Sequence, residues 1–241
     1  MIQFHDLRKA FDDNVVLQGF TLDVADGETM VIIGFSGSGK SVALKHVVGL
    51  LHPDAGDVIV DGRAVSTLDR AGLTALRHEI GYVFQFAALF DSMTVAENVG
   101  LGLVRRGLGD EEIAERVAEA LALVDLTGTD AKLPAELSGG MRKRVGIARA
   151  IALKPRYILY DEPTTGLDPV TSAVIDRLMV RTREHLGVTG IVVTHDLRSA
   201  YTVGDRIAML YEGRIRQAGT VAEIQRTTDP VVRQFIEGRP E

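Results

Sequence analysis

A glycine-rich turn between an apolar strand and a helix constrains the fold of this chain more than any other feature. The turn reads Gly34-Phe35-Ser36-Gly37-Ser38-Gly39-Lys40-Ser41. The apolar run Thr29–Ile33 before it predicts a buried strand, and the apolar spacing after Lys40 predicts a helix. Glycines allow successive backbone N–H groups to point inward, and the following helix directs its positive end to the same place. The pattern predicts a phosphate-binding loop, and an ordinary glycine-rich turn is the structural alternative.

The side chains of this loop suit the polyphosphate of a nucleotide. Lys40 would reach the β- and γ-phosphate oxygens, and the Ser41 hydroxyl would ligate Mg²⁺. The residues expected to contact the nucleotide here are Gly34, Ser36, Gly37, Ser38, Gly39, Lys40, Ser41 and Val42.

A second apolar strand ends in two carboxylates. The run Tyr157–Tyr160 is followed directly by Asp161 and Glu162. The carboxyl edge of a parallel sheet is where α/β proteins bind ligands. Asp161 would belong to the Mg²⁺ shell, and Glu162 would orient or deprotonate an attacking water. Two acids at a strand end can also cap the next helix, but together with the phosphate loop they favour a catalytic site.

Strands and helices alternate along the chain, which predicts an α/β fold with a parallel sheet covered on both faces. Asp110 is expected to cap one helix, Ser138 to open a second that runs through Ala152, and Asp168-Pro169 to start a third. A hairpin is expected around Glu212-Gly213. Further strands are expected at Phe20–Val24, Gly56–Val60 and Ile191–Thr194.

The string Leu137-Ser138-Gly139-Gly140-Met141 predicts a second anion site. A hydroxyl, two unobstructed N–H groups and the positive end of a helix dipole meet at this point. The structural alternative is a helix cap with glycines for close packing, which would explain Ser138 but not both glycines.

These motifs together resemble the ATP-binding-cassette (ABC) ATPases over essentially the whole chain. Leu-Ser-Gly-Gly resembles their signature motif, Gln85 the Q-loop glutamine and Gly166-Leu167-Asp168 the D-loop. His195 follows an apolar strand as the switch histidine does, and Phe11 lies where an aromatic ring stacks on adenine. The resemblance implies an α/β P-loop NTPase (RecA-like) with a mainly parallel sheet, an N-terminal antiparallel β subdomain and an inserted helical subdomain. The core would comprise residues 1–86 and 157–241, and the helical subdomain residues 87–156.

The resemblance also implies roles for the remaining site residues, with ATP and Mg²⁺ as cofactors. Two copies would enclose two ATP molecules head to tail, with Ser138, Gly139 and Gly140 of one copy on the γ-phosphate held by the other. His195 would hold the γ-phosphate, or be a buried structural histidine. Gln85 would ligate Mg²⁺, contact the attacking water and connect to a membrane permease. Asp168 would line the interface, cap its helix, or both.

Three stretches resemble the ATPases of Mla/Mce phospholipid transport systems, namely Phe84–Val99, Leu137–Arg144 and Asp229–Gly238. This implies an integral permease, a lipid-binding Mce-domain protein and a small regulatory cytosolic subunit as partners. An apolar patch would receive a helix of the permease, or pack inside the helical subdomain; its members are Phe86, Leu89, Phe90 and Met93. An ABC transporter with another cargo and a mechanochemical ABC protein remain alternatives. Glu162 and His195 argue against a nucleotide-binding module without hydrolysis.

Charge and composition argue against nucleic-acid binding and favour a cytoplasmic protein. The net charge is −6, and a duplex binder needs a basic stripe. One basic cluster, expected to be a solvated helix face, contains Arg142, Lys143, Arg144, Arg149, Lys154 and Arg156. Cysteine is absent, and neither a signal peptide nor an apolar run of about 18 residues is recognisable. We therefore expect the chain to attach to the inner face of the cell membrane only through its permease.

Overall fold

The computed structural model describes residues 1–239 and divides the chain into two compact units. The first comprises Met1–Arg77 and the chain from Thr189 onward, and the second comprises His78–Val188. The segment 87–156, expected to form a helical subdomain, lies entirely within the second unit.

An antiparallel sheet occupies the N-terminal part of the first unit. Its strands are β2 (Asn14–Val24), β1 (Ile2–Phe11), β4 (Ala55–Val60) and β5 (Arg63–Ala64), in that spatial order. The buried rings of Phe4 and Phe20 meet edge to face across it, with centroids 5.0 Å apart. The long strand β1 was not predicted, because its register shifts between Phe4 and Leu7, where Asp6 has φ +44°. Such a bulge interrupts the alternation on which strand prediction depends.

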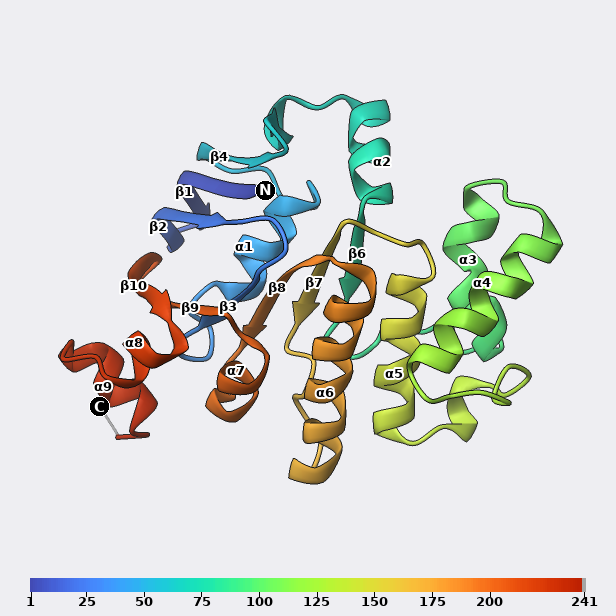
Figure 1. Ribbon diagram of the computed structural model, residues 1–241. Helices are drawn as coiled ribbons and strands as arrows, with labels where there is room; N and C mark the ends of the chain where they lie inside the picture. The colour runs from blue at the N-terminus through green and yellow to red at the C-terminus, as the bar shows by residue number, and fades with distance from the viewer. Residues whose placement is uncertain (240–241) are drawn as a thin grey trace. The chain divides into compact units, whose positions relative to one another are not determined.

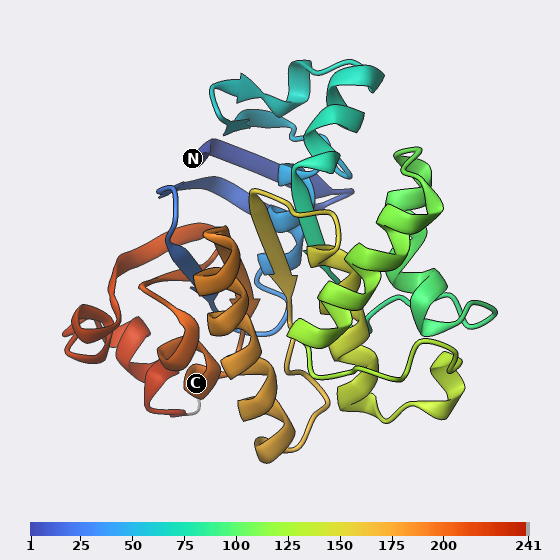
Figure 2. The ribbon, with the colours of Figure 1, turned by 45° about the vertical axis from the view of Figure 1, so that its right-hand side comes forward.

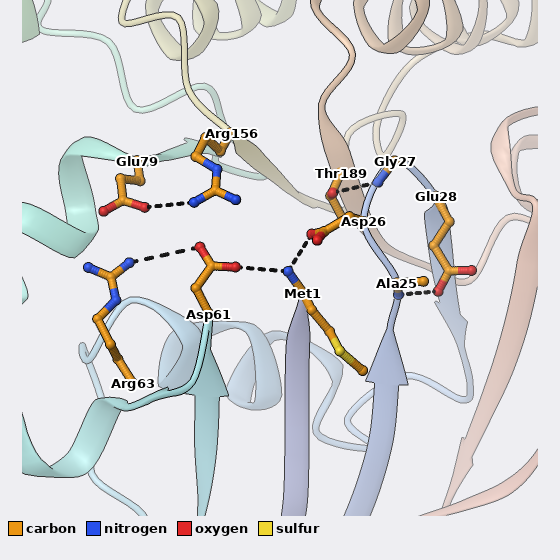
Figure 3. Close-up of polar contacts among 10 residues, drawn as sticks. All are labelled: Met1, Ala25, Asp26, Gly27, Glu28, Asp61, Arg63, Glu79, Arg156 and Thr189. Carbon is orange, nitrogen blue, oxygen red and sulfur yellow. Dashed lines mark hydrogen bonds and ion pairs between the residues drawn. The ribbon is translucent and has the colours of Figure 1, made fainter.

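Polar contacts fix the turns at one end of this sheet (Figure 3). The N-terminal ammonium of Met1 contacts the carboxylates of Asp26 and Asp61, the latter at 3.0 Å. Gly27 N–H donates to Thr189 Oγ1 over 2.9 Å. The Met1 contacts join the start of β1 to the turn before β3 and to the turn after β4, and the Gly27 contact joins the turn before β3 to the start of β8. Together they hold the start of the strand that leads into the phosphate loop.

The first unit also contains parallel strands that carry this loop. Strand β3 (Thr29–Ile33) pairs in parallel with β8 (Thr189–Thr194) and with β9 (Arg206–Tyr211). All of β3 is buried, as its continuous apolar sequence predicts. Strand β10 (Arg214–Thr220) pairs antiparallel with β9 in the expected hairpin, whose turn residues Glu212 and Gly213 both have positive φ.

Short helices complete this unit. They are α1 (Lys40–Val47), α2 (Arg70–His78), α7 (Leu197–Val203), α8 (Val221–Gln225) and α9 (Pro230–Ile236), with a 3₁₀ turn at Val65–Thr67. Helix α1 stops well before Pro53, where the sequence places a helix breaker, because Gly49 turns the chain with φ +60°.

The second unit combines a parallel strand pair with a helical cluster. Strands β6 (Ile80–Val83) and β7 (Tyr157–Asp161) pair in parallel. Helices α3 (Val95–Arg105), α4 (Asp110–Leu123) and α5 (Gly139–Ile151) lie side by side in Figures 1 and 2. Helix α6 (Pro169–Leu186) follows β7, and a 3₁₀ turn at Pro134–Glu136 precedes α5.

The helix starts of the second unit follow the expected chemistry with one exception. Ser138 caps α5 and Asp168 caps α6, as predicted. The expected cap of α4 is wrong, because Gly109 occupies the cap position and Asp110 is the first helical residue. Asp110 therefore stabilises α4 through its negative charge near the positive end of the helix rather than as the cap.

Within residues 1–239, no helix has both the length and the apolar character that crossing a bilayer requires.

Candidate functional site

The phosphate loop of the first unit folds around its own lysine. Lys40 is 6 % exposed, and its ammonium donates hydrogen bonds to the carbonyls of Gly34 (2.9 Å) and Phe35 (3.1 Å). The N–H of Ser38 also donates to the Phe35 carbonyl, over 3.2 Å. Gly39, with φ +102°, precedes α1, and no side chain caps this helix. The loop thus brings one buried cation and an uncapped helix start to the same place.

This loop fits a polyphosphate on two observations. The Ser38 hydroxyl is buried and has no hydrogen-bond partner among residues 1–239. A Cβ at Gly37 would meet nothing within 4 Å, whereas one at Gly34 would lie 2.5 Å from the Leu210 carbonyl oxygen. The loop is therefore crowded by protein where the chain turns and open at Gly37, and it holds a buried hydroxyl suited to an anionic oxygen.

The other predicted residues of the first unit lie at strand ends. Phe11 is the last residue of β1 and is 41 % exposed, with the Lys9 ammonium 5.5 Å from its ring centroid. His195 follows β8 directly and is exposed. The alternative of a buried structural histidine at position 195 is therefore wrong.

The two predicted carboxylates lie together at the end of β7 in the second unit. Asp161 and Glu162 are 6 % and 8 % exposed. The Tyr82 hydroxyl donates to Asp161 Oδ2 (3.0 Å), and the Thr165 hydroxyl donates to Glu162 Oε2 (2.9 Å). Burial and the Asp161 charge raise the pKa of Tyr82 far above its usual value, so the phenol stays a donor. Glu162 has φ +49°, a conformation that costs a non-glycine residue free energy and is found at functional sites.

A buried lysine joins the predicted catalytic segments, and the sequence analysis did not identify this role. Lys143 of α5 is 6 % exposed, and its ammonium donates to the carbonyls of Gln85 and Glu162, the latter over 3.3 Å. Burial lowers the pKa of Lys143, and the charges of Glu162 and Asp161 oppose that shift. The sequence held a signal, since Lys143 shares a helix face with Ile147 and Ile151 at intervals of four residues.

Two arginines of α5 also bind loop backbone. The Arg149 guanidinium donates to the carbonyls of Ala87 (2.6 Å) and Ala88 (2.7 Å), both of which have positive φ. Arg144 donates to the carbonyls of Val124 and Asp125. The expectation that this basic cluster is a solvated helix face is therefore wrong for Lys143, Arg144 and Arg149, because their charges pair with carbonyls.

The signature and D-loop residues meet at the N-termini of α5 and α6. Ser138 Oγ accepts the N–H of Met141 (3.3 Å), and Asp168 accepts the N–H groups of Val170 and Thr171. A Cβ at Gly140 would lie 2.5 Å from Thr171 Cγ2, whereas one at Gly139 would be 3.8 Å from its nearest neighbour. Close packing therefore explains Gly140 but not Gly139. Ser138, Gly139 and Asp168 are exposed.

The apolar patch beside Gln85 faces solvent. Phe86 and Phe90 are 82 % and 48 % exposed, so the alternative of packing inside the helical subdomain is wrong for both rings. The buried Asn98 side chain accepts the Phe90 N–H and donates to the carbonyls of Phe90 and Met93. The patch backbone is thus held in place while its rings stay exposed.

Mg²⁺ prefers oxygen ligands and is usually held by one or two carboxylates, hydroxyls, water and substrate phosphates. Ser41 of the first unit and Asp161 and Gln85 of the second offer such oxygens. The oxygen chemistry of these residues, taken in each unit by itself, is therefore compatible with Mg²⁺.

Comparison with known proteins identifies the family of this chain. The family model described as ABC transporter matches residues 17–165. The probable ribonucleotide transport ATP-binding protein mkl of Mycobacterium tuberculosis is 40 % identical over 99 % of this chain and 67 % of its own length. The chloroplastic protein TRIGALACTOSYLDIACYLGLYCEROL 3 of Arabidopsis thaliana is 40 % identical over 99 % of this chain and 74 % of its own. The methionine import ATP-binding protein MetN of Xylella fastidiosa is 40 % identical over 98 % and 72 %.

Solved structures of this family have the same fold. The ATP-binding cassette MJ0796, solved as a dimer in a post-hydrolysis state bound to ADP and Pi, superposes with a TM-score of 0.83 at 35 % identity, covering 92 % of this chain and 99 % of that one. The cbiO1 protein of Clostridium perfringens, part of the transporter complex cbiONQ, gives a TM-score of 0.86 at 31 % identity, covering 98 % and 94 %. The predicted fold class is thereby confirmed. The chain belongs to the ABC transporter family, as an ATP-binding subunit that hydrolyses ATP with Mg²⁺.

Proposed function

We propose that this chain works as an ATP-sandwich homodimer that drives a membrane permease in phospholipid transport across the cell envelope. The observation that carries the nucleotide site is the phosphate loop, where the buried Lys40 ammonium and the unpartnered Ser38 hydroxyl lie beside the open position at Gly37. The proposal places ATP there, with the Phe11 ring on adenine.

The residues of the proposed site have different roles in hydrolysis. Lys40 binds the β- and γ-phosphate oxygens, with Gly34–Val42 around them and His195 on the γ-phosphate. Ser41, Asp161 and Gln85 would hold Mg²⁺, which would supply positive charge to neutralise the phosphates. Glu162 orients the attacking water and accepts its proton, while the Thr165 hydroxyl holds Glu162 Oε2.

Dimerisation uses the exposed starts of α5 and α6. Ser138 and Gly139 present a hydroxyl and backbone N–H groups at a helix start, which attract an anionic oxygen. In the proposed dimer they meet the γ-phosphate bound by the other copy, together with Gly140, and Asp168 lies at the same interface. The dimeric MJ0796 cassette supports this arrangement.

The exposed patch provides a docking surface for the permease. Phe86 and Phe90 lie one and five residues after Gln85, so a helix seated on them would respond to movement of the Q-loop. This role places the chain in the cytoplasm, on the inner face of the membrane. The lipid cargo is supported by the resemblance of Phe84–Val99, Leu137–Arg144 and Asp229–Gly238 to Mla/Mce ATPases, which also implies an Mce-domain protein and a small regulatory subunit. One relative, moreover, bears the name of a galactolipid. Relatives named for methionine and sulfate/thiosulfate import support another cargo as the alternative.

Substitutions of Lys40 and Glu162 test the nucleotide site. ATP-Mg²⁺ at ~100 times its dissociation constant should stabilise the protein by about 2.7 kcal/mol in thermal unfolding, and Lys40→Ala should abolish this shift. Glu162→Gln should bind ATP without turnover and elute as a dimer in size-exclusion chromatography. A normal shift in Lys40→Ala would show that ATP binds elsewhere.

The permease surface is tested with a matched pair of charges. Phe86→Asp should leave the ATPase activity of the isolated chain unchanged but remove its stimulation by the permease. Val104→Asp introduces the same charge at another exposed apolar position, which is 60 % exposed, and should retain stimulation. Equal stimulation of both variants would exclude Phe86 from the docking surface.

The lipid assignment is tested on the complex purified from detergent-solubilised membranes. Phospholipid should be detected in it by mass spectrometry, and the complex should move labelled phospholipid between liposomes only when ATP is supplied. A permease accompanied by a solute-binding protein that holds an amino acid, sugar or ion would refute the lipid cargo and leave the ATPase assignment intact.

A further inference from the structure

A helix distant in sequence contacts the phosphate loop through an aromatic pair. The rings of Phe35, in the loop, and Phe235, in α9, meet edge to face with centroids 5.0 Å apart and planes at 84°. The centroid of the Tyr211 ring, at the end of β9, lies 6.2 Å from that of Phe35. The Phe35 ring is therefore close to two other rings, although its own motif requires no aromatic residue there.

Phe35 also governs the curvature of the loop through its backbone. Its carbonyl accepts both the Ser38 N–H, over 3.2 Å, and the Lys40 ammonium, over 3.1 Å. The same residue thus closes the turn and orients the lysine. Because the ring and the carbonyl belong to one residue, a displacement of the Phe35 backbone that follows loss of the ring contact would also move the acceptor of Lys40.

Helix α9 is anchored well enough to act on the loop. Asp229 caps it by accepting the N–H groups of Val231 and Val232, over 3.0 and 3.1 Å. The Asp229 carboxylate also accepts a hydrogen bond from Arg216 Nε of β10, over 2.8 Å. Val232 is fully buried, and it lies on the same face of α9 as Phe235 because the two residues are three positions apart. Phe235 therefore projects from a fixed support.

From this geometry we propose that Phe235 is a positioning residue for ATP binding. Its ring holds Phe35, and Phe35 in turn holds the Lys40 ammonium and the turn of the phosphate loop. This makes α9 an element that sets nucleotide affinity from outside the nucleotide-binding motifs. The inference rests on the proposed nucleotide site at Gly34–Ser41.

Calorimetric titration of the full chain with ADP and Mg²⁺ tests the inference without turnover. Phe235→Ala should weaken ADP binding about three- to tenfold, the range expected when one edge-to-face pair is lost. In ATPase assays the same variant should raise KM and leave kcat within about twofold. Phe235→Trp should restore most of the affinity, since it keeps an aromatic edge. Thermal unfolding without nucleotide establishes that each variant is folded.

A double-mutant cycle shows whether Phe235 acts through Phe35. Phe35→Ala should weaken binding by a similar factor, and the double variant should be no weaker than either single one. The matched control is Arg233→Ala, which removes the ion pair between Arg233 of α9 and Glu237, the C-cap residue of that helix, and should not change ADP affinity.

The outcomes separate this inference from the site on which it rests. Normal binding by Phe235→Ala, with loss of binding by Lys40→Ala, overturns the positioning role and leaves the nucleotide site standing. Equal weakening by Phe235→Ala and Arg233→Ala also overturns it, because the effect then belongs to α9 in general. Normal binding by Lys40→Ala overturns the nucleotide site itself.

Discussion

The hydroxyl of Tyr82 donates a hydrogen bond to Oδ2 of Asp161 over 3.0 Å, and so links the paired strands β6 and β7. Asp161 is 6 % exposed, so this donor replaces water that burial has removed from the carboxylate. The bond fixes the orientation of an oxygen ligand proposed for Mg²⁺.

Removal of this donor should affect stability and metal use together. A hydrogen bond to a charged group contributes about 1.5–3 kcal/mol, so Tyr82→Phe should lower the free energy of unfolding by that amount. The Mg²⁺ concentration for half-maximal ATPase activity should rise several-fold, because the carboxylate loses its fixed orientation. Urea denaturation and a Mg²⁺ titration measure the two effects, with Tyr201→Phe in α7 as the control. An unchanged Mg²⁺ requirement would contradict the proposal that Asp161 is a ligand of the metal.

Lys143 should be essential for turnover rather than for ATP binding. Lys143→Met keeps the aliphatic stem and leaves the carbonyls of Gln85 and Glu162 without their ammonium. We expect kcat to fall about tenfold or more and the dissociation constant for ATP to change less than threefold. Arg142→Met, at an exposed position of the same helix, is the matched control. A variant with normal kcat would show that the ammonium does not position these segments.

The two signature glycines should respond differently to the same methyl group. Gly140→Ala places a Cβ 2.5 Å from Thr171 Cγ2 and should cost about 1–3 kcal/mol of stability. Gly139→Ala has space and lies in the first turn of α5, so stability should stay the same or rise by up to about 1 kcal/mol. Gly139→Ala should nevertheless reduce ATP-dependent dimerisation, because the methyl group occupies the proposed closing surface. Unfolding and size-exclusion measurements on both variants compare them directly.

His46 should make stability depend on pH. It is 1 % exposed in α1, its Nδ1 donates to the Val42 carbonyl (2.7 Å), and its Nε2 has no partner among residues 1–239. Burial lowers the pKa of His46, with the nearby Lys9 charge acting in the same direction and Asp54 against it. The His46 imidazole is protonated near pH ~6.5 in the unfolded chain, and only at a lower pH in the folded chain. Stability is therefore complete above about pH 6.5 and decreases as the pH falls toward the folded pKa.

Substitution of His46 should flatten this dependence. His46→Leu fills a similar volume without a titratable group, so its free energy of unfolding should vary less between about pH 5 and 7. Urea denaturation across this range, with substitution of the exposed His5 by glutamine as the control, provides the measurement. A slope as steep as that of the unmodified protein would assign the pH dependence to other groups.

Structural features that depend on residues close together in the sequence could be predicted. The strand–loop–helix at Thr29–Val47, the cap at Ser138 and the acidic end of β7 each depend on neighbours a few positions apart. Their patterns report directly on backbone geometry. The positions of these motifs in the fold therefore agree with expectation.

Features that depend on distant backbone could not be predicted. The acceptors of Lys143 are main-chain carbonyls 58 and 19 residues away, which leave no trace in side-chain patterns. The contact between Phe35 and Phe235 likewise joins residues that are far apart in the sequence. The cap of α4 was displaced by one residue, because Gly109 and Asp110 are both acceptable at a helix start.

The close contact of Gly140 with Thr171 bears on how two copies could associate. The absence of a side chain at Gly140 lets the first turn of α6 approach α5 closely. Ser138 and Asp168, which cap these two helices, therefore lie on elements that are already packed together within one subunit. In the proposed dimer, these helix starts would therefore lose little conformational entropy on association. The association rate would depend on the relative orientation of the two subunits rather than on the rearrangement of separate loops.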